Sequence, residues 1–147
     1  MNHERVIAYV DGFNLYFGLK SQRLERAYWL DIPGLLARFL GPGQRLLETK
    51  YFTSRISGPP DKAKRQTTYL EALATLPGVA MFFGHYQADA RRCRKCGETW
   101  HENREKMTDV QIAVELLKDA MADRLDVAFI VSADSDLVPP IRAFREL

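Results

Sequence analysis

The feature that most constrains the fold is a series of short apolar runs, each followed by a segment with helical periodicity. The runs from Val6 to Val10 and from Val127 to Val131 are apolar at every position, which is typical of strands buried on both faces of a sheet. Further strands are predicted at 46–52 and 79–86. Strands of this kind that alternate with helices predict an α/β fold, with a parallel sheet of four to five strands and helices on both faces.

The length and composition predict a single domain over residues 1–147. A chain of 147 residues with 46% hydrophobic content can bury one sizeable core. Helices are predicted shortly after Asp11, from Pro33, from Asp61, over 107–122 and over 137–144. Residues 88–104 are polar, contain both cysteines and are predicted to form an inserted loop. The last helical pattern still continues at Leu147, so a fifth strand is expected either to follow outside this sequence or to be absent from the protein.

The N-terminus and the cysteine content favour a cytoplasmic protein. The apolar run that begins at Val6 is too short for a signal sequence, and no run approaches the length of a membrane span. Two cysteines separated by two residues, without an export signal, are typical of a reducing compartment. The formal net charge is only +2, so composition alone neither requires nor excludes a nucleic-acid partner. The sequence leaves open whether the chain forms a homodimer.

Aspartates follow two of the predicted strands and begin one predicted helix. Asp11 directly follows the first strand, and Asp134 and Asp136 follow the strand that ends at Val131. Asp109 lies three and four positions before apolar residues of the long helix, which places it on the core-facing side. Ligands of open parallel sheets bind beyond the carboxyl ends of the strands. Converging carboxylates at that edge predict a site for Mg²⁺ or Mn²⁺.

Each of these aspartates also has an ordinary structural interpretation. Asp11 with Gly12 alone would be read as a turn after a strand. Asp109 could favour the helix dipole, with Thr108 and Gln111 forming a capping box around it. Asp136 or Ser135 could cap the last helix. These interpretations are credible singly, but they do not explain why all four carboxylates fall at one predicted edge.

Three motifs in this order resemble the NYN domain, a LabA-like branch of the PIN-like nucleases. They are Asp11-x-x-Asn14 after the first strand, Glu105-Lys106-x-x-Asp109 at the start of a helix, and the segment from Ser132 to Pro139 with the sequence SADSDLVP. Family members often carry glycine where this chain has Ala133. The resemblance implies a PIN-like Rossmannoid fold and metal-dependent ribonuclease activity. Matching of the motifs implies that the acidic residues of the active site are Asp11, Asp109, Asp134 and Asp136. It implies that their polar partners are Asn14 and Ser132.

The implied reaction is hydrolysis of a phosphodiester bond. Metal ions held by the aspartates would activate a water for in-line attack, and cleavage would leave a 5′ phosphate. Asn14 would orient water or phosphate, Ser132 would fix the neighbouring carboxylates, and Lys106 would reach a phosphate. We considered two alternatives: a non-catalytic RNA-binding module stabilised by zinc, and a phosphohydrolase with Asp11 as nucleophile. The second usually needs an aspartate two residues later, where this chain has Phe13.

Two basic groups could contact RNA phosphates beside the acidic residues. The first group lies at the start of the helix predicted from Asp61 and consists of Lys62, Lys64 and Arg65. The second lies around the two cysteines and consists of Arg91, Arg92, Arg94 and Lys95. For the first group a solvated basic surface is an equally good interpretation.

The segment Cys93-Arg94-Lys95-Cys96-Gly97 has the spacing of a zinc knuckle. It supplies two of four tetrahedral ligands, and His85 and His101 are the candidates for the other two. Such a Cys₂His₂ site would be structural and would brace the basic segment. The alternative is two free thiols.

Overall fold

The core of the protein is a four-stranded parallel sheet. The computed structural model describes residues 3–147, apart from the side chain of Asn103. The sheet has the order β3-β2-β1-β6 and consists of β1 (Glu4–Asp11), β2 (Gln44–Thr53), β3 (Val79–Phe83) and β6 (Val127–Val131). The predicted α/β class, the parallel sheet and the four strands are confirmed.

The strand order creates a change of direction beside β1. The chain passes from β1 to β2 and then to β3 on one side, whereas β6 returns to pair with the other edge of β1. In open α/β sheets the crevice at such a switch point, beyond the carboxyl ends of the strands, is where ligands bind. The continuous apolar run at Val6–Val10 is explained by its central position, because every one of its residues is at most 1% exposed.

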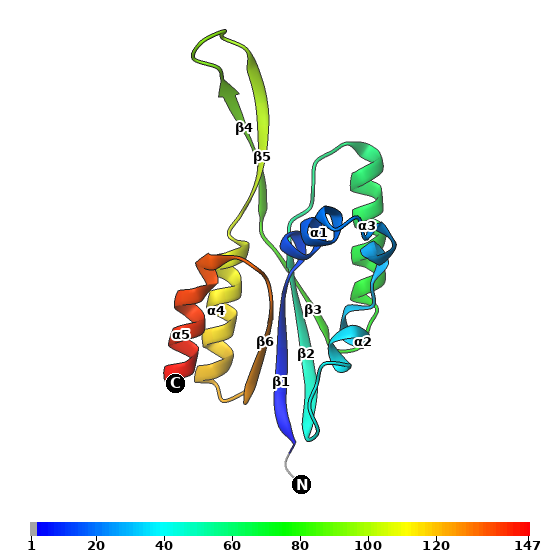
Figure 1. Ribbon diagram of the computed structural model, residues 1–147, viewed down its shortest axis with the longest axis vertical. Helices are drawn as coiled ribbons and strands as arrows, with labels where there is room; N and C mark the ends of the chain where they lie inside the picture. The colour runs from blue at the N-terminus through cyan, green and yellow to red at the C-terminus, as the bar shows by residue number, and fades with distance from the viewer. Residues whose placement is uncertain (1–2) are drawn as a thin grey trace.

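Helices cover both faces of the sheet, as predicted (Figure 1). One face carries α4 (Thr108–Met121) and α5 (Val138–Glu146), and the other carries α2 (Ile32–Ala37) and α3 (Pro60–Ala74). Helix α1 (Gly12–Ser21) follows β1, and two short 3₁₀ helices, η1 (Glu25–Trp29) and η2 (Ser135–Leu137), complete the body. None of the described helices is both long enough and apolar enough to cross a membrane.

The segment predicted as a loop at 88–104 is instead most of an antiparallel hairpin. Strands β4 (His85–Arg92) and β5 (Thr99–Lys106) pair along their full length, and only the tip between them is a turn. The prediction failed because both faces of the hairpin are polar and exposed, so there is no apolar alternation to mark a strand. Figure 1 shows the hairpin projecting from the end of the body at which β1 finishes.

The predicted strand at 79–86 is in fact two strands divided at Gly84. Its backbone N–H donates a hydrogen bond to the carbonyl of Thr53 at 2.8 Å, which ends the pairing with β2. A Cβ atom at this position would lie 2.6 Å from the carbonyl oxygen of Lys106, so only glycine allows the two hairpin strands to meet here.

A buried ionic network ties β1, β2 and α4 together. Lys50, in the middle of β2, is 2% exposed, and its ammonium group lies 2.7 Å from Glu115 and 2.7 Å from Asp119. The Tyr9 hydroxyl donates to Asp119 at 2.7 Å, and Arg124 lies 2.6 Å from the same carboxylate. Although burial alone would raise the pKa of Asp119, the hydrogen bond and the charge of Lys50 hold that pKa below its ordinary value.

We predict that Lys50→Met destabilises the fold by about 3–5 kcal/mol, because it leaves two carboxylates buried without their shared cation. Lys118→Met is the matched control, because Lys118 also pairs with Glu115, at 2.6 Å, but is 65% exposed. It is expected to cost at most about 1 kcal/mol. Urea unfolding of both variants measures the difference, and equal effects would contradict a stabilising role for the buried network.

Candidate active site

Asp11 is the buried carboxylate at the centre of the predicted site. It is the last residue of β1 and the N-cap of α1, and it is only 6% exposed. One carboxylate oxygen accepts a hydrogen bond from the backbone N–H of Asn14 at 3.1 Å, and the other accepts from the Ser132 hydroxyl at 3.1 Å. The interpretation of Asp11 as an ordinary turn residue therefore accounts for the cap but not for the contact with the segment after β6.

Asn14 and Ser132 join the ends of β1 and β6. The side-chain oxygen of Asn14 accepts from the backbone N–H of Ala133 at 2.9 Å, and the Ser132 hydroxyl accepts from the backbone N–H of Asp134 at 3.1 Å. The Asn14–Ala133 bond and the Ser132–Asp11 bond each join residues more than 100 positions apart, so the first and third sequence motifs meet in one place. Both polar partners implied by the resemblance lie at the sheet edge.

Asp134 and Asp136 lie on the exposed side of this edge. Asp134 is the N-cap of η2, where its carboxylate accepts from the backbone N–H of Asp136 at 2.9 Å. The last helix, α5, begins after Leu137 without a side-chain cap, so the prediction that Asp136 or Ser135 caps it is wrong. The carboxylate of Asp136 makes no hydrogen bond or ion pair within the described part of the chain.

Asp109 lies half-buried in the first turn of α4, but without the predicted capping box. The helix begins after Met107, which has a left-handed φ of 77°, and no side chain caps it. Thr108 donates its hydroxyl to Glu105 at 2.6 Å, and Gln111 donates to the carbonyl of Phe83 at 3.1 Å. The position of Asp109 therefore follows from the hairpin leading into the helix rather than from a cap.

Glu105 is a further acidic residue of the site that the sequence interpretation did not include among the metal ligands. It lies at the end of β5 and accepts hydrogen bonds from the hydroxyls of Thr108, at 2.6 Å, and Ser54, at 3.2 Å. Burial raises the pKa of Glu105 to about 7, and the negative charges of Asp11 and Asp109 contribute to the increase. The resembling motif began at this residue, but only the fold shows that its carboxyl group is enclosed.

The electrostatics of Asp11 indicate a site without a cation of its own. Burial raises the pKa of Asp11 above its ordinary value, and the charges of Asp134 and Asp109 raise it further, against the hydrogen bonds from Asn14 and Ser132. Carboxylate, hydroxyl and amide oxygens are the donors that Mg²⁺ and Mn²⁺ prefer. Within residues 3–147 as described, however, no three acidic, histidine or cysteine side chains lie close enough to hold an ion in their present rotamers.

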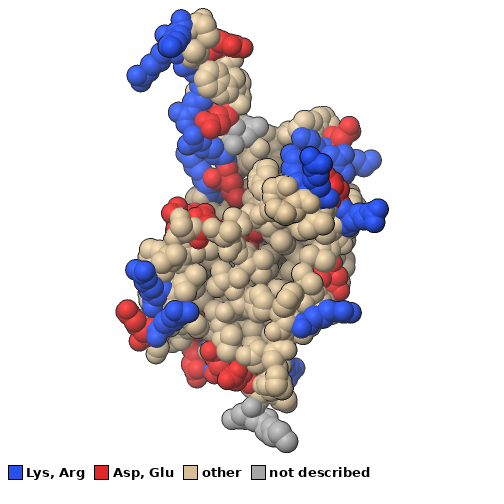
Figure 2. Space-filling model, in the orientation of Figure 1, with Lys and Arg blue, Asp and Glu red and all other residues tan. Residues whose placement is uncertain are grey.

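The predicted basic residues fall into two separate surfaces. Lys62 and Arg65 line a cavity between α1 and α3, whereas Lys64 does not line it. Figure 2 shows positive side chains along the projecting hairpin, which carries Arg91, Arg92, Arg94 and Lys95. The guanidinium of Arg91 is not free, because it lies 2.8 Å from Glu102. Lys106 is exposed at the base of the hairpin.

The two cysteines form a knuckle at the hairpin tip. The backbone N–H of Gly97, at a φ of 75°, donates to the Cys93 carbonyl at 3.0 Å. Backbone N–H groups, with that of Cys96 foremost, point at the Cys93 sulfur and lower the pKa of its thiol. This geometry favours a thiolate and hence a metal ligand.

The predicted histidine ligands do not join this knuckle. His85 begins β4 and is therefore eight residues of extended chain from Cys93, about 25 Å away. His101 pairs with Ala90, about 10 Å along the hairpin from Cys93. The predicted Cys₂His₂ site that includes His85 is wrong. Residues 88–104 form an extended hairpin, which keeps His85 at the opposite end from the cysteines, rather than a loop that would bring them together.

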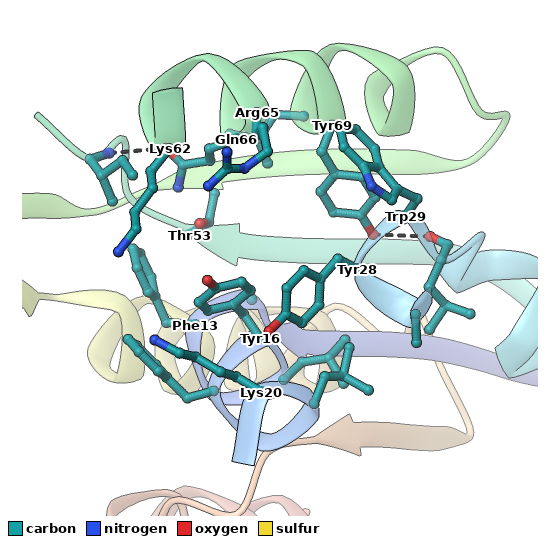
Figure 3. A pocket seen from close by; sticks show the side chains of 18 of the residues that line it. Phe13, Tyr16, Lys20, Tyr28, Trp29, Thr53, Lys62, Arg65, Gln66 and Tyr69 are labelled. Carbon is teal, nitrogen blue, oxygen red and sulfur yellow. Dashed lines mark hydrogen bonds between the residues drawn. The ribbon is translucent and has the colours of Figure 1, made fainter. Parts of the chain in front are cut away.

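An aromatic cavity of about 250 Å³ adjoins the site and was not anticipated from the sequence (Figure 3). It begins at Gly12, the residue after Asp11, and lies between α1, η1 and α3. Its aromatic lining consists of Phe13, Tyr16, Phe17, Tyr28, Trp29, Tyr51 and Tyr69. The sequence does not indicate this cavity, because its aromatic residues come from four separate segments of the chain.

Comparison with known proteins is consistent with the motif analysis. The family described as the NYN domain matches residues 5–147. The 6-hydroxy-3-succinoylpyridine 3-monooxygenase HspA of Pseudomonas putida is 28% identical over an alignment that covers 96% of this chain and 55% of that protein. The chain thus spans about half the length of this curated relative. No solved structure matches the chain significantly.

We predict that the stability of the metal-free protein falls as the pH rises through 7. Because the pKa of Glu105 is raised to about 7, the folded state binds a proton that the unfolded state has already released. The stabilising effect of that proton is complete below the ordinary glutamate pKa and is lost as the pH passes the folded value. Glu105→Gln should flatten this dependence, as measured by urea unfolding between pH 5 and 8 in EDTA.

Glu71→Gln is the control, because Glu71 is an exposed glutamate on α3. This variant should show the same pH dependence of stability as the native protein. An unchanged pH dependence in Glu105→Gln would show that Glu105 is not the group that titrates.

Proposed function

Because the chain belongs to the NYN domain family, which is nuclease-like, we propose that it is a metal-dependent ribonuclease. The observation that carries this proposal is the arrangement at the sheet edge. A buried Asp11 accepts a hydrogen bond from the segment after β6 and is surrounded by the charges of Asp109 and Asp134, with no cation of the chain paired to it among the described residues. Buried carboxylates without a positive partner are unfavourable unless they are protonated or bind a metal ion.

Mg²⁺ or Mn²⁺ would be held by Asp11 together with Asp109, Asp134 and Asp136. Since Asp134 and Asp136 are exposed and Asp109 is half-buried, their side chains have room to rotate towards Asp11. When bound, such an ion supplies positive charge to the scissile phosphate and to the attacking water. The Asn14 and Ser132 hydrogen bonds hold the two strand ends at a fixed separation, so that the ligands need only side-chain motion to converge.

Glu105 is the candidate for accepting the proton of the attacking water. Its carboxyl group is enclosed, and a pKa of about 7 suits a general base at neutral pH. The water oxygen forms a bond to phosphorus while the bond from phosphorus to the 3′ oxygen breaks. One water proton passes to Glu105, and the departing 3′ oxygen takes a proton from solvent, leaving a 3′ hydroxyl and a 5′ phosphate.

RNA would be held by positive side chains on either side of this edge. Lys62 and Arg65 lie beside α1, and Arg92, Arg94 and Lys95 lie along the outer part of the hairpin. These residues contribute phosphate contacts rather than base selectivity, so binding through them should weaken as the salt concentration rises.

A second candidate function is the conversion of a small heteroaromatic molecule. The relative from Pseudomonas putida is named for a reaction of a hydroxylated pyridine, and the aromatic cavity of this chain is of a suitable character. At 28% identity and with half of that protein unmatched, the activity does not transfer with the name. The carboxylate cluster favours the ribonuclease, because an acidic edge beside the cavity would repel the carboxylate of a succinoyl group.

We predict that the purified protein cleaves RNA in Mg²⁺ or Mn²⁺ and that EDTA abolishes cleavage. Asp109→Asn and Asp134→Asn should each lower the rate at least about 100-fold, because each removes a charged ligand next to Asp11. Cleavage of a labelled single-stranded RNA, with the products tested for a 5′ phosphate, measures this.

Asp123→Asn is the matched control, because Asp123 is an exposed aspartate after the far end of α4. It should cleave at the native rate. Cleavage that persists in EDTA, or native rates in both active-site variants, would overturn the proposal. RNA binding without turnover would instead favour a non-catalytic module, and a trapped phosphate on Asp11 would favour a phosphohydrolase.

We also propose that Cys93 and Cys96 bind zinc, on the strength of the knuckle geometry at the hairpin tip. Cys93 and Cys96 are two of the four ligands of a tetrahedral zinc site, so a second copy of the chain would supply the other two in a Cys₄ site. We predict about one zinc ion per two chains and its loss in Cys93→Ser, together with dissociation to monomers. Metal analysis combined with light scattering tests this, and a zinc-free native monomer would contradict it.

A further inference from the structure

We propose that the aromatic cavity binds one unstacked base of a single-stranded RNA beside the cleavage site. This inference rests on the proposed ribonuclease function, which it deepens by naming the form of the substrate. The cavity lies between α1, η1 and α3, and its aromatic rings come from separate segments of the chain (Figure 3). Five observations support it: the exposure of its rings, its size, the charge of its lining, the hydroxyl of Tyr51 and its position.

The aromatic rings are exposed in a way that folding alone does not explain. Trp29 and Phe17 are each 55% exposed and Tyr16 is 37% exposed, although all three line one cavity. The ring centroids of Tyr16 and Tyr28 lie 5.0 Å apart, and Trp29 lies edge-on to Tyr69 at 6.1 Å. The aromatic side chains of the cavity therefore pack against one another. Preformed aromatic faces of this kind are what proteins use to stack nucleobases.

The size of the cavity limits the ligand. A volume of about 250 Å³ is below the range of about 300–1,000 Å³ that holds drug-sized molecules. It is suited to one flat ring system and excludes a helical stack of bases. A base must therefore leave its neighbours to enter, which selects a single-stranded segment over a duplex.

The charge of the lining favours a ligand that carries phosphate. Lys20, Lys62 and Arg65 line the cavity, and its lining contains no acidic residue. None of the three cations forms an ion pair within the part of the chain that the structure describes. Figure 3 shows Lys20 and Lys62 extending towards the same end of the cavity as Phe13. An uncharged ring would leave these cations unused, whereas a nucleotide provides both a ring and an anion.

The hydroxyl of Tyr51 is placed to read the edge of the ring. Tyr51 is 6% exposed and lines the cavity, and its hydroxyl has no hydrogen-bond partner among the described residues. Burial raises the pKa of Tyr51, so the hydroxyl remains a donor. By contrast, Gln66 bonds to the backbone of Ile56 and Ser54, and the Tyr69 hydroxyl bonds to the carbonyl of Leu30.

The cavity and the carboxylates are adjacent through the backbone of Gly12. A Cβ atom on Gly12 would lie 2.7 Å from the Tyr51 hydroxyl, so the absence of a side chain lets the tyrosine reach the residue next to Asp11. A base against Tyr51 is thus one residue away from the end of β1, which puts the phosphates of its nucleotide at the acidic edge. The base pocket would orient the strand while the carboxylates act on it.

The test uses Trp29 as a reporter of stacking. The chain has two tryptophans, so Trp100→Phe leaves Trp29 as the only one. Asp109→Asn and EDTA are added so that binding is measured without cleavage. Titration with oligouridylate should quench Trp29 fluorescence, whereas an abasic oligonucleotide with the same number of phosphates should not. Tyr16→Ala should weaken binding about fivefold or more, the effect of losing one stacking partner.

Phe39→Ala is the control, because Phe39 is a 65% exposed aromatic residue outside the cavity, and it should bind as tightly as the parent. Circular dichroism checks that Tyr16→Ala is folded, and Tyr16→Leu replaces it if it is not. Cleavage of RNA by the native protein without Trp29 quenching, or with unchanged binding in the Tyr16 variant, overturns the base pocket and leaves the ribonuclease intact. Quenching by 6-hydroxynicotinate but not by RNA overturns it in favour of a small-molecule site.

Discussion

The burial of one carboxylate, that of Asp11, determines how the functional end of the molecule is arranged. Its two oxygens accept hydrogen bonds from α1 and from the segment after β6, and these bonds extend the backbone pairing of β1 with β6 beyond the strand ends. Among the described residues, this group receives hydrogen bonds but has no positively charged partner. Because the strand order reverses beside β1, the same bonds also define the crevice in which the ligands of such sheets bind.

The molecule contains a second buried carboxylate, and the contrast between the two separates structure from function. Asp119 contacts Lys50 and Arg124, which lower its pKa, and the resulting network lies in the body of the fold between α4 and the sheet. Burial raises the pKa of Asp11, and the neighbouring carboxylates of Asp134 and Asp109 raise it further. A carboxylate whose charge the chain itself compensates stabilises the fold, whereas one left uncompensated at a switch point is suited to an external cation.

The sequence predicted those parts of the structure that depend on burial. The apolar runs at Val6–Val10 and Val127–Val131 are strands as predicted, although only the first is central and the second is a half-buried edge strand, and the aspartates that follow them lie at one edge of the sheet. Where burial gives no signal, the sequence predicts wrongly: it indicates a loop at the polar hairpin, and it therefore groups His85 with cysteines that lie far from it. The enclosure of Glu105 and the aromatic cavity depend on tertiary contacts between distant segments, which no local pattern encodes.

The central claim is that carboxylates from three distant segments share a divalent cation. The most direct measurement is an anomalous difference map from crystals soaked in Mn²⁺. The account predicts a manganese peak within ligand distance of Asp11 and of at least one of Asp109 and Asp134, with the latter two side chains rotated towards it. The absence of manganese from this edge, with the three carboxylates still apart, would contradict the account.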